Sequence, residues 1–97
     1  MDTTNAIDTI PDTIPTKPAL SRMFRMQWEP AQNSHVLLYP EGMVKLNGSA
    51  AEILKRCDGT RDVPAIVAEL EHAFGTSGLR PDVDDFLRAA LERGWLA

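Results

Sequence analysis

The stretch HVLLYPEGMVKLNGSAAEILKRCDG, residues 35–59, carries the clearest secondary-structure signals in this chain of 97 residues. Its first five residues form an apolar run, typical of a strand that is central in a small sheet or covered on both sides. Pro40 and Gly42 stand at the second and fourth positions of a turn, where proline presets φ and glycine tolerates positive φ. Residues 43–47 alternate between two faces, as in a further strand. The short connection predicts that these two strands pair antiparallel.

Another strand is predicted upstream of this stretch. Phe24, Met26 and Trp28 alternate with polar side chains, which is the pattern of a half-buried strand, and Glu29-Pro30 ends it. Because the connections are short, the three strands should form an antiparallel meander with the second strand in the middle. The strand over residues 43–47 is then one edge of the sheet, and the first strand is the other.

Three helices are predicted after the strands. Each has apolar residues at helical spacing and residues that can cap its start and stop its end. The predicted starts are Ser49, with Glu52 in a capping box, then Asp62 and Asp82, and the predicted stops are Asp58-Gly59, Gly75 and Gly94. Trp95 and Leu96 can then fold back onto the core. The expected fold is α+β and winged-helix-like: a three-stranded antiparallel sheet followed by a three-helix bundle (β-β-β-α-α-α).

The N-terminal residues 1–20 differ in composition from the rest of the chain. They are rich in Thr, Pro and Asp, and the unit Asp-Thr-Ile-Pro occurs at 8–11 and again at 12–15. Prolines restrict their neighbours to extended conformations and exclude helix. Residues 1–20 are therefore predicted to be a disordered tail, and residues 21–97 to form one small domain.

The composition argues against several classes of function. The single cysteine, Cys57, cannot form a disulfide within the chain, and no signal peptide or apolar run of membrane-spanning length is present. We therefore expect a cytoplasmic protein without membrane contact. No catalytic Ser/His/Asp order, His-x-x-x-His motif or glycine-rich phosphate loop appears, so no enzymatic activity, cofactor or metal site is expected. Asp82, Asp84 and Asp85 cluster at a predicted helix N-terminus, where they complement the helix dipole.

The charge distribution argues against nucleic-acid binding. The net charge is −4, and residues 62–97 carry three basic against seven acidic side chains. A recognition helix should bring Arg and Lys to phosphates, whereas the predicted third helix carries Arg88 and Arg93 among more numerous carboxylates. Residues 22–61 carry six basic against four acidic side chains, which fits an acidic partner or ordinary surface charge.

The predicted sheet edge suggests peptide binding. The unpaired N–H and C=O groups of an edge strand can bond an extended peptide that adds to the sheet. Here the edge is residues 43–47, and Phe86, Leu87 and Leu91 of the third helix could supply pockets for alternate peptide side chains. The alternative is that Lys45 prevents edge pairing and that these apolar residues belong to the core.

Several short motifs also occur together along residues 18–97. They are Pro18-x-Leu20, Trp28-Glu29, Val36 to Gly42, Leu46-Asn47, Ala50, Ile53-Leu54, Cys57-Asp58-Gly59, Val63, Ile66-Val67, Leu70, Asp82-Val83, Phe86-Leu87 and Gly94-Trp95-Leu96. In this combination the sequence resembles the PqqD family of pyrroloquinoline quinone (PQQ) biosynthesis, a type of precursor-peptide recognition element. The tandem Asp-Thr-Ile-Pro unit departs from the family pattern, so nothing is carried over to it.

This resemblance implies a peptide chaperone rather than an enzyme. Such proteins bind the ribosomal precursor peptide PqqA and present it to the radical SAM enzyme PqqE, which cross-links a Glu and a Tyr of that peptide. In this domain type the peptide adds beside the third strand and packs on the third helix. Carried onto this chain, the peptide-binding residues are Met43, Val44, Lys45, Leu46, Asn47, Phe86, Leu87, Arg88 and Leu91.

Two other classes of function stay open beside this one. They are a winged-helix DNA-binding regulator and a scaffold subunit that binds an enzyme but no free peptide. For the chaperone, the implied partners are PqqA and PqqE, with neither nucleic acid nor membrane. We expect a monomer in solution, and an exposed first strand on a mobile tail would also allow a domain-swapped dimer.

Overall fold

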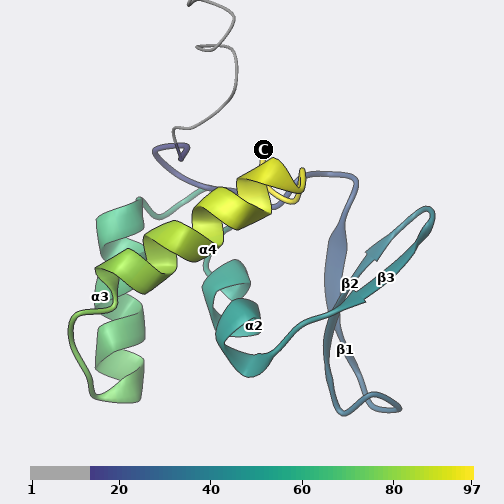
Figure 1. Ribbon diagram of the computed structural model, residues 1–97, viewed down its shortest axis with the longest axis horizontal. Helices are drawn as coiled ribbons and strands as arrows, with labels where there is room; N and C mark the ends of the chain where they lie inside the picture. The colour runs from purple at the N-terminus through teal and green to yellow at the C-terminus, as the bar shows by residue number, and fades with distance from the viewer. Residues whose placement is uncertain (1–13) are drawn as a thin grey trace, which may run out of the picture.

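The computed structural model describes residues 14–97, where three strands precede three helices (Figure 1). The strands are β1 (Arg25–Glu29), β2 (Ser34–Tyr39) and β3 (Gly42–Lys45), and the helices are α2 (Gly48–Lys55), α3 (Val63–Phe74) and α4 (Arg80–Glu92). This order confirms the predicted β-β-β-α-α-α arrangement. Within the described part of the chain, each helix is too short or too polar to cross a bilayer.

The sheet has the order β1-β2-β3, and both strand pairs are antiparallel. The predicted meander with the second strand in the middle is therefore confirmed. Leu37 of β2 lies opposite Met26 on one side and Val44 on the other. Leu37 belongs to the hydrophobic core, and its two partners pack against it. Among the described residues β3 pairs with β2 alone, so one edge of β3 is free.

Two details of the strands differ from what the sequence predicts. Gly42 does not have a positive φ; instead, a Cβ at this position would lie 3.3 Å from the hydroxyl oxygen of Tyr39. Glycine therefore leaves room for that ring. Trp28 is 49% exposed, and its ring packs edge-on against His35 with the centroids 5.1 Å apart. The alternating pattern thus places Trp28 on β1 but not in the core.

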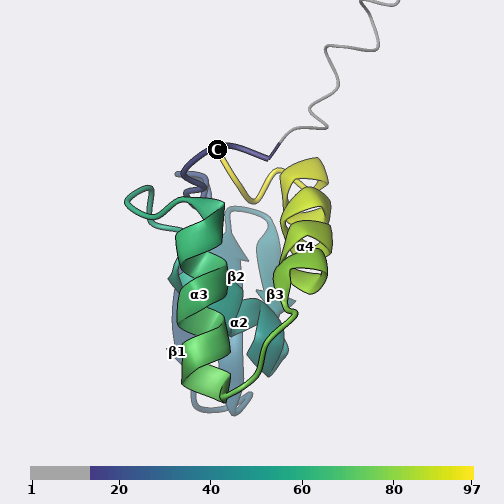
Figure 2. The ribbon, with the colours of Figure 1, turned by 90° about the vertical axis from the view of Figure 1, so that its left-hand side faces the viewer.

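The hydrophobic core joins the helices to one face of the sheet. In Figure 1, α2 lies between the sheet and α3, while α4 crosses above the other helices; in Figure 2, α4 and β3 lie on the same side of the domain. The most completely buried side chains of this core include Leu37, Leu54, Ile66, Leu70, Val83, Leu87 and Ala90. Burial of one Leu or Ile side chain stabilises a fold by roughly 1.5–3 kcal/mol. The core therefore fixes the position of α4 relative to the sheet.

The predicted cap of the first helix is wrong. Asn47, not Ser49, is the N-cap: its backbone is extended, and its side-chain oxygen accepts a hydrogen bond from the N–H of Ala50 at 2.8 Å. Since the helix begins two residues earlier than expected, Ser49 lies inside its first turn. Glu52 does not reach back to a cap but pairs with Lys55, which is the main reason that the pKa of this carboxyl is lowered.

The start of the third helix is also earlier than predicted. α4 begins at Arg80, so Asp82 lies in its first turn, where it faces the positive end of the helix dipole, and does not cap it. The residue before the helix, Leu79, instead donates its backbone N–H to the Glu71 carboxylate at 3.0 Å. The predicted cap of α3 is confirmed, because Asp62 accepts a hydrogen bond from the N–H of Ala65 at 2.9 Å.

The folded domain begins a few residues before position 21. Pro18 is buried, its carbonyl accepts a hydrogen bond from the Gly59 N–H at 3.0 Å, and Leu20 forms an isolated bridge with Leu96. Ala19 lies next to the C-terminus, where its carbonyl accepts a bond from the last residue. Residues 18–20 are thus part of the fold, although the predicted tail spans residues 1–20. Residues 1–13 of that tail lie outside the described residues.

Candidate functional site

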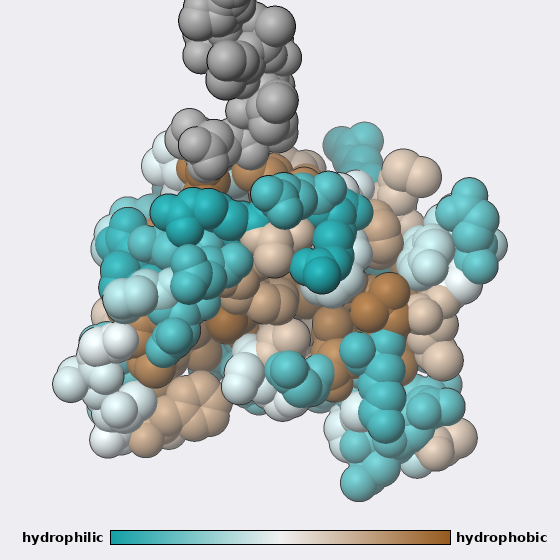
Figure 3. Space-filling view, in the orientation of Figure 1, coloured by the Kyte–Doolittle hydropathy of each residue, from teal (hydrophilic) through white to brown (hydrophobic). Residues whose placement is uncertain are grey.

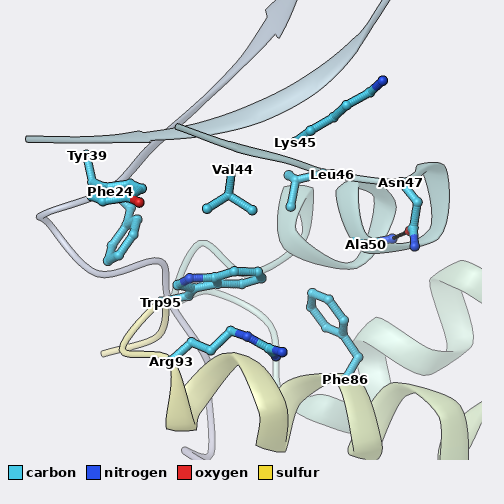
Figure 4. Close-up of a pocket in the computed structure, with 10 residues that line it drawn as sticks. All are labelled: Phe24, Tyr39, Val44, Lys45, Leu46, Asn47, Ala50, Phe86, Arg93 and Trp95. Atoms are coloured by element: carbon cyan, nitrogen blue, oxygen red, sulfur yellow. Dashed lines mark hydrogen bonds between the residues drawn. The ribbon is translucent and has the colours of Figure 1, made fainter. Parts of the chain in front are cut away.

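A groove of about 600 Å³ lies between β3 and the C-terminal half of α4 (Figure 4). Its walls come from the segment before β1, from β2, β3 and α2, and from α4 with the residues that follow it. The lining residues are Phe24, Tyr39, Val44, Lys45, Leu46, Asn47, Ala50, Phe86, Arg93 and Trp95. In the space-filling view, apolar atoms gather between the polar surface of α4 and the hairpin (Figure 3).

The free edge of β3 forms one side of this groove. The N–H of Leu46 donates to the carbonyl of His35 at 2.9 Å, so the backbone of this residue is directed toward β2. Positions that bond to the neighbouring strand alternate along an antiparallel pair. The N–H and C=O groups of Met43 and Lys45 therefore point away from β2. These are the groups that an added strand would bond, and the edge that carries them lies toward α4 (Figure 2).

The side chains along β3 (Gly42–Lys45) and of the residue after it, Leu46, also alternate with respect to the groove. Val44 and Leu46 point toward Trp95 and Phe86, whereas Lys45 extends away from them (Figure 4). Val44 is half-buried and Leu46 is buried, so both present apolar surface to the groove from the strand side. An extended segment in the groove would meet apolar surface with every second side chain.

Trp95 reaches the groove because the chain reverses at Gly94. The N–H of Gly94 donates to the carbonyl of Leu91 and the N–H of Trp95 to that of Ala90, which is the Schellman pattern of helix ends. Gly94 has a φ of 77°, a left-handed conformation that glycine adopts without a steric cost. The reversal brings the Trp95 ring to within 6.4 Å of the Phe86 ring, measured between centroids. A glycine after the helix thereby shapes the aromatic wall.

Gly94→Ala is expected to lower the free energy of unfolding by roughly 1–2 kcal/mol, because a Cβ is disfavoured in the left-handed region. It should also shift the Trp95 ring, which a change in near-ultraviolet circular dichroism would report, with urea unfolding measuring stability. Gly78→Ala is the matched control, since Gly78 has the same φ of 77° and neither position has an atom within 4 Å of an added Cβ. An equal spectral change in both variants would contradict this role for Gly94.

Arg93 brings positive charge to the aromatic wall. Its guanidinium carbon lies 5.5 Å from the centre of the Trp95 ring, within range of a cation–π interaction. Lys45 is the second cation of the groove, and among residues 14–97 no Asp or Glu lines it. The groove therefore combines apolar walls with an excess of positive charge.

Five of the nine predicted binding residues lie along this groove, and four do not line it. The five are Val44, Lys45, Leu46, Asn47 and Phe86. The remaining four are on the same strand and helix but are directed elsewhere. Most of the predicted residues in and next to the strand therefore line the groove, whereas only one of the predicted helix residues does.

Each of the four other residues has a different environment. Met43 is on the free edge, with a side chain that is 45% exposed outside the groove. Leu87 has no exposed surface and belongs to the core, and Leu91 packs against that core. Arg88 is paired with Asp85 at 3.3 Å on the outer surface of α4. The helix thus presents Phe86 to the groove and keeps Leu87 inside the domain.

Sequence reasoning missed five residues of the groove. They are Phe24, Tyr39, Ala50, Arg93 and Trp95. Phe24 and Tyr39 form one end, with ring centroids 5.4 Å apart. The predicted helix stop at Gly94 does indicate that Trp95 returns toward the domain, but it does not show that the ring lines a groove.

The thiol of Cys57 lies outside the groove. Cys57 is buried, and burial, with a smaller contribution from the charge of Asp58, raises the pKa of its thiol to about 11. Over residues 14–97, no three His, Cys, Asp or Glu side chains are arranged to hold a metal ion. The groove itself offers hydrogen bonds, charge and apolar surface, which are means of binding an extended chain.

The sequence matches a known family model over most of the folded domain. The model described as Coenzyme PQQ synthesis protein D (PqqD) matches residues 34–96. A "PqqA binding protein" of Azotobacter vinelandii is 61% identical over 80 residues, which cover 81% of this chain and 87% of the relative. The protein of the same name from Stutzerimonas stutzeri is 56% identical over the same lengths.

A solved structure has the same fold. It is the solution NMR structure of the PqqD part of Methylobacterium extorquens PqqCD, described as a functional, stand-alone recognition element for ribosomally synthesized and post-translationally modified peptides. Its TM-score to this chain is 0.69 at 26% sequence identity, and the match covers 90% of this chain and 97% of the other. The likeness extends over the sheet and the helices that border the groove.

Proposed function

The chain belongs to the PqqD family, and from this membership we propose that it binds the precursor peptide PqqA in the groove between β3 and α4. Relatives that share more than half of their aligned residues with it are named for binding PqqA. The structural neighbour is described as a recognition element for precursor peptides of this kind. The function proposed is thus recognition of a peptide in PQQ biosynthesis.

The observation that carries the proposal is the free edge of β3 beside the apolar wall of α4. A peptide added to this edge would bond to the outward N–H and C=O groups of Lys45 and Met43. Alternate side chains of the peptide would face Val44 and Leu46 on one side and Phe86 on the other. The backbone bonds supply affinity for any extended chain, and the pockets supply the choice of sequence.

Binding of this kind must offset the ordering of a flexible peptide. Coupled folding and binding costs roughly 2–5 kcal/mol of the gross interaction energy. Micromolar affinity corresponds to about 8 kcal/mol of net binding free energy. A few ladder bonds at about 1 kcal/mol each do not reach this value, so the apolar contacts with Trp95 and Phe86 must contribute a large share.

We further propose that the bound peptide is presented to the radical SAM enzyme PqqE. Tethering PqqA to a carrier beside the enzyme raises the effective concentration of the peptide there without new contacts to the reacting residues. The carrier needs no catalytic group, cofactor or metal for this task. A cytoplasmic location, where a ribosomal peptide is made, is part of the proposal.

Calorimetric titration with synthetic PqqA tests the proposal, with a scrambled peptide of the same composition as control. We expect saturable one-to-one binding to PqqA and no binding to the scrambled peptide. Equal binding of both peptides would indicate a non-specific apolar surface. Absence of binding by a folded, monodisperse sample would overturn the assignment of PqqA as the ligand of the free protein.

A further inference from the structure

The three arginines of α4 and its C-terminal cap differ in their partners. Arg80 bonds to the carboxylate of Asp84 at 3.0 and 3.1 Å, and Arg88 pairs with Asp85 at 3.3 Å. Arg93 has no carboxylate within ion-pair distance in the part of the chain that the structure describes. The one arginine of this set that lines the groove is therefore the one whose charge is not neutralised by a neighbour.

The position of Arg93 is defined by the end of the helix. Its own N–H donates to the carbonyl of Ala89 at 3.1 Å, so its backbone is held as the last part of α4. The side chain runs along the Trp95 ring toward Phe86 (Figure 4). The guanidinium group therefore lies beside the aromatic wall on the α4 side of the groove, with the Arg93 side chain exposed to solvent.

The positive charge continues into an adjoining hollow. This second hollow is lined by Arg22, Met23, Phe24, Arg25, Leu38, Tyr39 and Pro40, so it shares the Phe24–Tyr39 ring pair with the groove. Arg22 and Arg25 form no ion pair within residues 14–97. Together the two hollows are lined, within the described part of the chain, by four cations and no carboxylate, in a protein with a net charge of −4.

We propose that Arg93 is a specificity-determining residue that binds a carboxylate of the peptide in the groove, so that an acidic residue of PqqA fixes its register there. The inference rests on the proposed binding of PqqA in this groove and adds the chemistry by which the peptide is selected. A guanidinium can bond both oxygens of a carboxylate in a fixed plane. Such a pair distinguishes one register of an added strand from a register shifted by one residue, in which the carboxylate would point to the opposite face.

Arg93 rather than Lys45 is assigned this role because their side chains point in different directions. Lys45 extends away from Trp95 and Phe86, so its charge lies at the rim, where solvent screens an ion pair and its contribution is small. Arg93 is also exposed, but its guanidinium lies over the Trp95 ring and is directed along the aromatic wall of the groove, where it can meet a carboxylate of a bound peptide in a fixed plane. Arg93 is therefore expected to affect affinity more than Lys45 does through its side chain.

The test compares PqqA binding by the wild-type protein, Arg93→Gln and Arg80→Gln, with circular dichroism to verify folding. Arg80→Gln is the matched control, because it removes the same charge from the same helix outside the groove. Loss of a charge-assisted bond should weaken binding by Arg93→Gln about 10-fold or more, while Arg80→Gln stays within about 2-fold. Arg93→Lys keeps the charge without the planar fork and should bind with intermediate affinity.

The acidic residue of the peptide is then found by replacing each Asp and Glu of PqqA singly by Asn or Gln. For one such peptide, the loss of affinity for the wild-type protein should equal the loss that Arg93→Gln causes with unchanged PqqA. When that peptide is combined with Arg93→Gln, the affinity should fall no further. The inference would be overturned if, for every peptide, the losses from the peptide substitution and from Arg93→Gln were additive. It would also be overturned if Arg93→Gln bound PqqA with wild-type affinity. In both cases the proposed binding of PqqA would still stand. Failure of the wild-type protein to bind PqqA would instead remove the proposed function, and the inference with it.

Discussion

Lys45→Pro is expected to abolish measurable PqqA binding in a domain that remains folded. The N–H of Lys45 points away from β2, as the bond between Leu46 and His35 requires. Proline is tolerated on an edge strand when the missing N–H faces outward. The substitution should therefore leave the β2–β3 pair intact and remove a donor from the free edge to which the peptide would add.

The size of this effect follows from the two groups that lose a partner. Loss of the ladder bond removes about 1 kcal/mol, and the peptide carbonyl that is buried without a donor costs a further ~1–3 kcal/mol. The total of about 2–4 kcal/mol corresponds to a loss of roughly 30- to 1,000-fold in affinity. A micromolar complex would then lie near or beyond the upper limit of calorimetric titration.

Lys45→Ala separates the backbone donor from the side chain. It removes the same ammonium group but keeps the N–H, and the exposed side chain extends away from Trp95 and Phe86 at the rim of the groove, so affinity should change by less than about 3-fold. Titration of both variants with PqqA, together with urea unfolding, provides the measurement. Wild-type affinity in folded Lys45→Pro would place the peptide somewhere other than the edge of β3.

The arrangement of the strands could be predicted because its signals are local. The apolar run of β2 and the short turn after it require an antiparallel neighbour, and two short turns in succession place β2 in the middle. The free edge of β3 follows from that order alone. By contrast, the capping-box pattern predicts Ser49 as the cap of the first helix, and only the extended backbone of Asn47 in the folded domain shows that Asn47 caps it instead.

The helix side of the groove could not be predicted in the same way. Phe86, Leu87 and Leu91 all lie on the apolar part of α4, and sequence alone does not show which of them faces the core and which faces the groove. That division depends on where α4 lies relative to α3 and β3, which is set by packing across the whole domain. From the sequence, Arg93 is only a possible contact to phosphate. The sequence predicts that Trp95 folds back after Gly94, but not that the Arg93 guanidinium lies over the Trp95 ring.

Leu87 and Phe86, which are neighbours on α4, should therefore have separate roles, one in stability and the other in peptide binding. Leu87→Ala is expected to lower the free energy of unfolding by roughly 2–5 kcal/mol, since the side chain is fully buried and its loss leaves a cavity. A domain of about 80 residues has a total of roughly 4–12 kcal/mol, so much of its stability would be lost. The fraction that remains folded should bind PqqA with unchanged affinity, because Leu87 does not line the groove.

Phe86→Ala should show the opposite behaviour. Phe86 is only half-buried in the free protein but forms the wall opposite β3, so its removal should destabilise the domain less and weaken PqqA binding by roughly 5- to 30-fold. Urea unfolding and calorimetric titration of both variants, at a temperature where both are folded, separate the two effects. Tight binding by Phe86→Ala, or weak binding by fully folded Leu87→Ala, would mean that the peptide contacts a different face of α4. The two outcomes expected here would instead assign Phe86 to recognition and Leu87 to the fold, although the two side chains are adjacent in the sequence.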